Sequence, residues 1–333
     1  SRMSAESALG DGLGLATSMS MQLRERFPMP TVPNGWYAVL LSRELRGTPV
    51  PLHVLDQELV AFRDDAGRPT VLDAYCPHLG THLGHGGCVV DGEIECPFHR
   101  WRFDAEGHCT HATNATTMPR ARLRAWPTRE QDGVVYVWYH ATSSSPSWEV
   151  PAMPRGDRAY STPIHLRWRV ATHVQEIREN IGDETHFGVI HNLPQAGAPD
   201  FDPRGPFATL SFPSRFDLLG RILHFDTRCD MAGPGILCMR TLGLVDTRIV
   251  VLSTPADGAT SDLRLLVSTT NLGRVPFTRW MLAPVVAMLA KRDVDKEVDI
   301  WGHKRWLERP IYVGPERTQR EIRSWYRQFY DHG

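Results

Sequence analysis

The chain has 333 residues, of which 41% are hydrophobic and 23% are charged, and its formal net charge is −1. This length is sufficient for two domains with separate hydrophobic cores. The near-neutral charge gives no electrostatic basis for binding nucleic acid or an anionic membrane surface. The longest apolar stretch, Met281–Ala290, contains Pro284 and is about half as long as a transmembrane helix requires. Because no signal peptide is recognisable, we expect a cytoplasmic protein without a transmembrane span.

The first 142 residues are predicted to hold a lead-in segment and a small β domain. Residues 1–34 form an irregular segment that ends in a proline-rich stretch. Residues 35–142 are predicted to be an all-β domain, because short β-branched and aromatic runs alternate there with glycine, proline and aspartate. The clearest of these runs are Trp36–Leu41, Glu58–Arg63, Glu93–Cys96 and Val134–Tyr139.

Residues 143–333 are predicted to form an α+β domain, in which an antiparallel sheet packs against helices in a helix-grip (START-like) arrangement. Helices are expected at Val174–Phe187, at Pro276–Trp306, with or without a break at Pro284, and at Glu316–Phe329. The strands expected between them are Arg221–Thr227, Ile236–Leu242, Arg248–Ser253 and Leu263–Thr270.

Four residues of the β domain have the spacing of an iron–sulfur site. Cys76-Pro-His78 is followed, after seventeen intervening residues, by Cys96-Pro-Phe-His99. In a Rieske [2Fe–2S] centre two cysteines hold one iron and two histidines hold the other. Each loop here supplies one thiolate and one imidazole, so the sequence predicts such a centre.

The alternative for these four residues is a Cys2His2 zinc site, which uses the same donors. Zinc fingers usually pair cysteine with cysteine and histidine with histidine, whereas the pairs here are mixed, and this favours the cluster. The other four cysteines fit no ligand pattern and are predicted to be buried free thiols: Cys88, Cys109, Cys229 and Cys238.

A second group of candidate ligands lies in the predicted helix of the second half. His186 and His191 are five residues apart, which on a regular helix is a rotation of about 140°. We therefore expect the helix to break between them, with Gly188 as the suitable position. Two histidines and one distant carboxylate form the facial triad that binds Fe(II) and leaves positions open for O2 and substrate. The alternative is two structural or surface histidines.

The pattern Asn180-x-x-Asp183-x-x-His186-x-x-x-x-His191 resembles the iron motif of the Rieske non-haem iron oxygenases. The resemblance implies a trimeric enzyme in which Asp183 links His186 to a Rieske histidine of the neighbouring subunit, and in which Asn180 lies close to the iron. The alternative for Asp183 is a carboxylate on the helix surface.

The third iron ligand is less clearly marked. The segment from Asp293 to Lys304 resembles the part of the family sequence that carries the ligand, and in that register the ligand is Glu297. Relatives place aspartate there, so Glu297 departs from the pattern. Asp293 lies one helical turn earlier on the same face and is the second candidate. A triad that lacks its carboxylate is the third alternative.

Further segments resemble the Neverland-type cholesterol 7-desaturases and the 3-ketosteroid 9α-hydroxylase oxygenases. The resemblance implies an oxidoreductase that uses O2 and takes electrons from NAD(P)H through a ferredoxin, a reductase or both, to desaturate or hydroxylate a hydrophobic sterol or steroid. These segments are 73–83, 95–103, 126–127, 135–140, 147–151 and 323–330.

Other functions remain open at this stage. An oxygenase acting on a bacterial secondary metabolite, such as an arylamine or a polycyclic aromatic, is the main alternative. A Rieske electron carrier and a lipid carrier with lost iron chemistry are two more.

Apolar residues of the second half are read either as core or as pocket lining: Ile222, Phe225, Ile236, Met239, Leu265 and Val267. Residues 280–289 are read as a core-facing helix or as an apolar lip at a membrane surface.

Overall fold

The chain is divided into two compact units. The computed structural model describes residues 25–191, 198–218, 221–258 and 260–330. The first unit is Val32–Pro154, and the second comprises Arg155–Tyr330 together with the described residues before Val32. This division lies at Pro154, whereas the sequence prediction put the domain boundary between residues 142 and 143.

The first unit is built of short antiparallel strands, as the alternation of apolar runs and turn residues predicted. Its described residues form three small sheets, with the strand orders β1-β11-β10, β2-β3-β4-β9 and β5-β6-β7-β8. Their bounds are Gly35–Leu41 (β1), Val50–Val54 (β2), Gln57–Arg63 (β3), Pro69–Asp73 (β4), Cys88–Val90 (β5), Glu93–Glu95 (β6), Arg102–Phe103 (β7), Cys109–His111 (β8), Ala125–Trp126 (β9), Thr128–Gln131 (β10) and Val134–Tyr139 (β11).

The second unit is organised around a seven-stranded antiparallel sheet with the order β12-β18-β17-β16-β15-β14-β13. Every neighbouring pair in this sheet is antiparallel, and except for β12 each strand pairs with the next one along the chain. The bounds are Ile164–Val170 (β12), Asp200–Arg204 (β13), Phe207–Leu218 (β14), Arg221–Ala232 (β15), Ile236–Leu242 (β16), Thr247–Asp257 (β17) and Thr260–Thr269 (β18).

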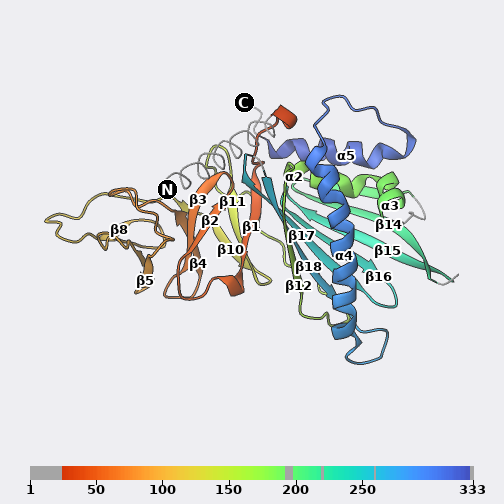
Figure 1. The fold of residues 1–333 in the computed structure, drawn as a ribbon, viewed down its shortest axis with the longest axis horizontal. Coiled ribbons are helices and arrows are strands. Elements are labelled where there is room, and N and C mark those ends of the chain that lie inside the picture. The colour runs from red at the N-terminus through yellow and green to blue at the C-terminus, as the bar shows by residue number, and fades with distance from the viewer. Residues whose placement is uncertain (1–24, 192–197, 219–220, 259, 331–333) are drawn as a thin grey trace, which may run out of the picture. The chain divides into compact units, whose positions relative to one another are not determined.

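One long helix, α4 (Thr278–His303), lies across this sheet and packs on β18 and β12 (Figure 1). Its inward side joins a buried cluster with Val170, Leu263 and Val267. The helix runs through Pro284 without a break, and the proline ring lies on the exposed side. The α+β prediction is therefore confirmed, with the helix uninterrupted.

Three shorter helices gather near the C-terminal half of α4 (Figure 1). They are α2 (Val174–Glu179), α3 (Glu184–Ile190) and α5 (Arg317–Tyr326). The short 3-10 turn η2 (Asn180–Gly182) joins α2 to α3. The region predicted as one helix is thus two helices, which meet at Asp183.

Candidate metal centres

The two Cys/His loops of the first unit have the same local backbone geometry. The amide of Gly80 donates to the carbonyl of Cys76 at 2.9 Å, and the amide of Arg100 donates to the carbonyl of Cys96 at 3.0 Å. Gly80 and Arg100 both have positive φ, 75° and 58°, a conformation that non-glycine residues such as Arg100 rarely adopt. Each loop therefore makes the same tight turn, and its cysteine and histidine project from equivalent positions.

The thiols of these loops are buried and the imidazoles are more accessible. Cys76 and Cys96 are both 2% exposed, whereas His78 is exposed and His99 is half-buried. The two imidazole rings are 4.7 Å apart between centroids, and the ring of Trp101 stacks on His78 at 4.4 Å. The loops thus present two sulfur donors inside and two nitrogen donors toward solvent.

This donor set fits a Rieske cluster. Burial raises the pKa of the Cys76 thiol to about 11, and the neighbouring Cys96 thiol contributes to the increase. Two thiolates in such a site need cationic metal to stabilise them. Two thiolates and two imidazoles are the ligands of a [2Fe–2S] centre of this type.

The remaining cysteines are as predicted with one exception. Cys109, Cys229 and Cys238 are buried free thiols, but Cys88 is exposed. The prediction for Cys88 was wrong because this residue begins β5, a three-residue strand on which no side chain is fully buried.

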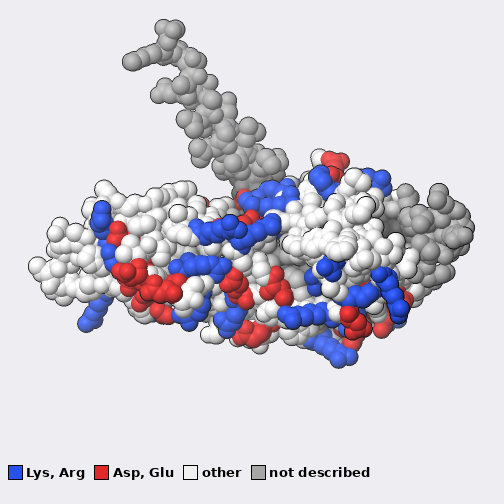
Figure 2. Space-filling model, turned by 90° about the horizontal axis from the view of Figure 1, so that it is seen from below, with Lys and Arg blue, Asp and Glu red and all other residues white. Residues whose placement is uncertain are grey.

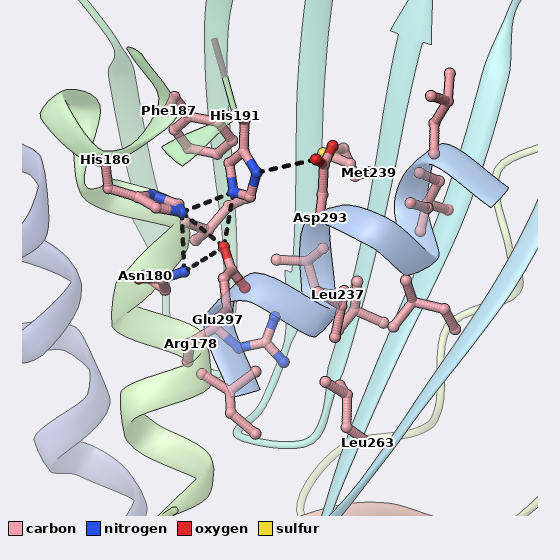
Figure 3. A pocket seen from close by; sticks show the side chains of 18 of the residues that line it. Arg178, Asn180, His186, Phe187, His191, Leu237, Met239, Leu263, Asp293 and Glu297 are labelled. Atoms are coloured by element: carbon pink, nitrogen blue, oxygen red, sulfur yellow. Dashed lines mark hydrogen bonds and ion pairs between the residues drawn. The ribbon is translucent and has the colours of Figure 1, made fainter. Parts of the chain in front are cut away.

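In the second unit, three side chains from distant parts of the chain converge on one point (Figure 3). Oε1 of Glu297 lies 2.7 Å from Nε2 of His186 and 2.7 Å from Nε2 of His191. The two Nε2 atoms are themselves 2.8 Å apart. These are two histidines and one carboxylate, the donor set of a facial triad for Fe(II). Two ring nitrogens and a carboxylate oxygen at these separations fit a shared cation.

The helices position the two histidines differently from the prediction. α3 continues through Gly188 and ends at Ile190, so that His191 is its C-cap residue. The break expected at Gly188 is therefore absent. His191 leaves the helix at its last turn, and its ring meets His186 edge-on with the centroids 4.7 Å apart. The end of the helix, rather than a kink inside it, brings the two rings together.

Glu297 is the carboxylate that faces both histidine nitrogens, and Asp293 faces the other side of His191. Oδ1 of Asp293 lies 3.7 Å from Nδ1 of His191 and 3.4 Å from the Lys296 ammonium. Glu297 is 8% exposed. Burial raises the pKa of Glu297, but hydrogen bonds from His186 and His191 outweigh it and hold the pKa below its ordinary value. Glu297 is thus held as a carboxylate.

The two polar residues before the histidines have distinct contacts. The side-chain amide of Asn180 donates to Oε1 of Glu297 at 3.0 Å and lies 3.2 Å from Nε2 of His186. Asp183 caps α3, because its Oδ1 accepts from the backbone amide of His186 at 3.1 Å. The sequence motif therefore places Asn180 against the three donors and Asp183 at the helix N-terminus beside them.

A cavity of about 300 Å³ adjoins the three donor atoms. His186, His191 and Glu297 line it at one wall, and apolar side chains from β16, β17, β18 and α4 form most of the rest (Figure 3). Mostly apolar walls with a few convergent polar groups are typical of sites for small hydrophobic ligands. The apolar lining residues are Ile177, Ile181, Phe187, Leu237, Met239, Ile249, Val251, Leu263, Leu265, Val286, Leu289, Ala290, Val294 and Trp301.

The pocket residues considered from the sequence divide into two groups. Met239 and Leu265 line the cavity, whereas Ile236 and Val267 belong to the buried core. Phe225 is half-buried and is not among the residues that line the cavity. The side chain of Ile222 lies outside the described residues. Sequence reasoning missed Arg178, which is 2% exposed and reaches the cavity wall; its position two residues before Asn180 was the only available signal.

Comparison with known proteins identifies the family. A profile of the Rieske [2Fe–2S] domain matches residues 35–127, and one of the 3-ketosteroid 9α-hydroxylase C-terminal domain matches residues 137–330. The chain belongs to the Rieske oxygenases. This Rieske oxygenase is an oxidoreductase that uses a [2Fe–2S] cluster, mononuclear iron, O2 and externally supplied electrons. Cys76, His78, Cys96 and His99 all lie within the matched Rieske domain.

Two curated proteins are similar to this chain in sequence, and a solved structure is similar to it in fold. Cholesterol 7-desaturase nvd of Drosophila melanogaster is 30% identical over 90% of this chain and 76% of its own length. The oxygenase component of 3-ketosteroid-9-alpha-monooxygenase of Rhodococcus rhodochrous is 28% identical over 89% of this chain and 83% of its own. Dicamba monooxygenase with non-haem iron and dicamba has the same fold, with a TM-score of 0.66, 18% identity, and coverage of 90% of this chain and 98% of that one. No helix in the described part of the chain has the length and apolarity needed to span a membrane.

Proposed function

We propose that this Rieske oxygenase desaturates or hydroxylates a sterol or steroid, with His186, His191 and Glu297 as the ligands of its mononuclear iron. One observation carries the proposal: the three donor atoms lie in the wall of a cavity whose other residues are mostly apolar. A large hydrophobic substrate there would place a carbon atom beside the metal. The relatives named for cholesterol and 3-ketosteroids support this substrate class.

Each residue of the centre has a proposed task. Iron bound here supplies the activation of O2. His186 and His191 hold the metal through Nε2, and Glu297 supplies the anionic oxygen. Asn180 fixes the orientation of Glu297 by its hydrogen bond to Oε1. The apolar walls orient the substrate and exclude water, which favours reaction at substrate carbon over loss of oxidising equivalents to solvent.

We further propose that electrons reach the iron through Asp183 in a homotrimer. A ferredoxin, a reductase or both would reduce the cluster held by Cys76, His78, Cys96 and His99. The cysteines are buried while His78 is exposed, so electrons would leave on the histidine side. Asp183 caps the helix that carries His186 and accepts from the His186 amide, a position suited to a link with a neighbouring subunit. We propose the cytoplasm, which contains NAD(P)H, as the location.

The test is a turnover assay with the purified enzyme, NADH and a ferredoxin–reductase pair. Cholesterol and a 3-ketosteroid are offered separately, and the products are weighed by mass spectrometry. A loss of two hydrogens or a gain of one oxygen is the expected result and separates desaturation from hydroxylation. Unchanged substrates with both metal centres loaded would refute the steroid proposal. An arylamine and a polycyclic aromatic are then the substrates to offer next.

A further inference from the structure

The first half of α4 has apolar residues on two sides, and only the inner side packs against the rest of the second unit. Val286 and Ala290 face inward and line the cavity. On the opposite side Met281 is 74% exposed and Met288 is 63% exposed, and with Trp280 and Val285 they form a continuous stripe at helical spacing. We call these four residues together with Phe277 the outer face of α4. Of the two interpretations of residues 280–289, the core-facing helix applies to the inner side, where Ala283 and Ala287 are buried, while the outer face is in solvent.

The residue before α4 adds to this face. Phe277 has φ of 64°, in the left-handed region that bulky side chains seldom adopt. It is nevertheless 74% exposed, so burial of its ring does not compensate for the strain. Residues held in sparsely populated backbone conformations cluster at active sites, ligand clamps and switch regions.

The chain segment that carries the outer face contains basic residues and no acidic ones. No acidic residue occurs between positions 271 and 292, while Arg274, Arg279, Lys291 and Arg292 are basic. Beyond this segment, Asp295 pairs with Lys291 at 2.6 Å and marks the end of the face. Figure 2, which views the molecule from below, shows an uncharged area on the second unit with Lys and Arg as well as Asp and Glu side chains around it. The formal net charge of the whole chain is −1, although this segment has an excess of basic residues.

The outer face is connected to the cavity through Leu289. This side chain lines the cavity and is also 45% exposed, because it lies on the flank of the helix between the inward and outward sides. Leu289 is therefore a side chain that the outer part of the helix and the cavity wall share.

We propose that the outer face of α4 docks on a lipid bilayer with anionic headgroups and that the substrate enters the cavity from that bilayer past Leu289. Exposed aromatic and aliphatic side chains enter the boundary between headgroups and acyl chains, and flanking basic residues pair with anionic headgroups. The entry of a sterol rests on the proposed function, but the docking itself does not.

The first experiment measures docking without turnover. The full chain with its metal centres loaded is sedimented with vesicles of phosphatidylcholine mixed with phosphatidylglycerol, and in parallel with phosphatidylcholine alone. We expect binding to the anionic vesicles that weakens with salt. The double variant Met281→Glu with Met288→Glu should reduce the bound fraction about tenfold, and both sites are exposed enough for the fold to be kept. Ile311→Glu is the matched control, since Ile311 is 92% exposed and lies outside the face; it should bind as the wild type does.

The outcomes separate docking from substrate identity. The proposal is overturned if the wild-type protein stays in the supernatant with both vesicle types. It is also overturned if Ile311→Glu and the double variant lose vesicle binding to the same extent. The face would instead be assigned to a second copy of the chain under two conditions. The wild type does not bind vesicles, and light scattering shows that the double variant has a different oligomeric state. If vesicles bind but no steroid is converted, the docking stands and the proposed function fails. If the wild type binds vesicles and also converts a steroid, the double variant should lose turnover of sterol supplied in vesicles and keep turnover of sterol supplied in cyclodextrin.

Discussion

The side-chain amide of Asn180 donates a 3.0 Å hydrogen bond to Oε1 of Glu297, a residue 117 positions further along the chain. The same oxygen lies 2.7 Å from Nε2 of both His186 and His191. Asn180 therefore holds the carboxylate in place beside the two imidazoles, and it ties the α2–α3 segment to α4. The packing of these helices and the proposed iron site thus depend on the same carboxylate oxygen.

Glu297 and Asp293 can be distinguished as iron ligands by substitution. Glu297→Gln keeps the shape of the side chain but removes its charge, so we expect iron bound at the mononuclear site to fall at least about tenfold. Asp293→Asn should keep most of the iron, because Asp293 faces Nδ1 of His191 rather than the shared point. Elemental analysis measures the iron, with the visible spectrum of the cluster as internal control. Loss of iron in Asp293→Asn alone would make Asp293 the ligand.

Asp183 should matter for electron transfer more than for stability. Asparagine is as good an N-cap as aspartate, so Asp183→Asn should leave the free energy of unfolding within about 0.5 kcal/mol of wild type. Product formation should fall at least about tenfold, while reduction of the cluster by the reductase, followed by absorbance, stays unchanged. Asp183→Ala, which also loses the cap, separates the two effects and should cost about 1 kcal/mol. Full activity of Asp183→Asn would contradict the proposed electron path.

Filling the cavity should weaken steroid binding. Met239 lines the cavity on β16, and Met239→Trp places a larger rigid ring there. We expect the KM for a steroid to rise about tenfold or more, with the cluster spectrum unaffected. Leu242→Trp is the control, because Leu242 ends the same strand but is 44% exposed. An unchanged KM in Met239→Trp would place the substrate elsewhere.

Mild acid should destabilise the second unit through His173. This residue caps α2, since its Nδ1 accepts from the Gln175 amide, and its other nitrogen bonds the carbonyl of Pro30 at 3.0 Å. Burial lowers the pKa of His173 from 6.5 to about 4, although the backbone of Pro30 and Thr31 opposes this. A lowered folded-state pKa means that the neutral ring stabilises the fold above pH 6.5. This contribution is lost as the pH falls from about 6.5 to about 4, by about 3 kcal/mol in all.

Urea unfolding at a series of pH values measures this dependence. His173→Asn keeps an acceptor at the cap but has no titratable group, so its free energy of unfolding should fall less steeply between about pH 6.5 and about pH 4 than that of the wild type. Equal slopes in the two proteins would show that His173 does not titrate on unfolding.

The strands were predictable where the alternation of side chains was local and regular. Two strands have the predicted bounds: β16 at Ile236–Leu242 and β11 at Val134–Tyr139. The predicted helix Val174–Phe187 is interrupted instead by η2 and Asp183. Ile177 of α2 and Phe187 of α3 belong to different buried clusters, and this separation depends on tertiary packing that the local sequence does not record.

The amino-acid sequence alone was enough to predict the family and to propose the four residues of the cluster site, because each loop carries its cysteine and histidine within a few positions and the spacing of the loops is distinctive. Only the tertiary structure decided which carboxylate of α4 meets the histidines. Asp293 and Glu297 lie on the same side of one helix, and which of them faces Nε2 depends on how α4 is rotated against β18 and β12. The same rotation leaves Met281 and Met288 in solvent. That rotation is set by contacts between segments far apart in the chain, which no local pattern records.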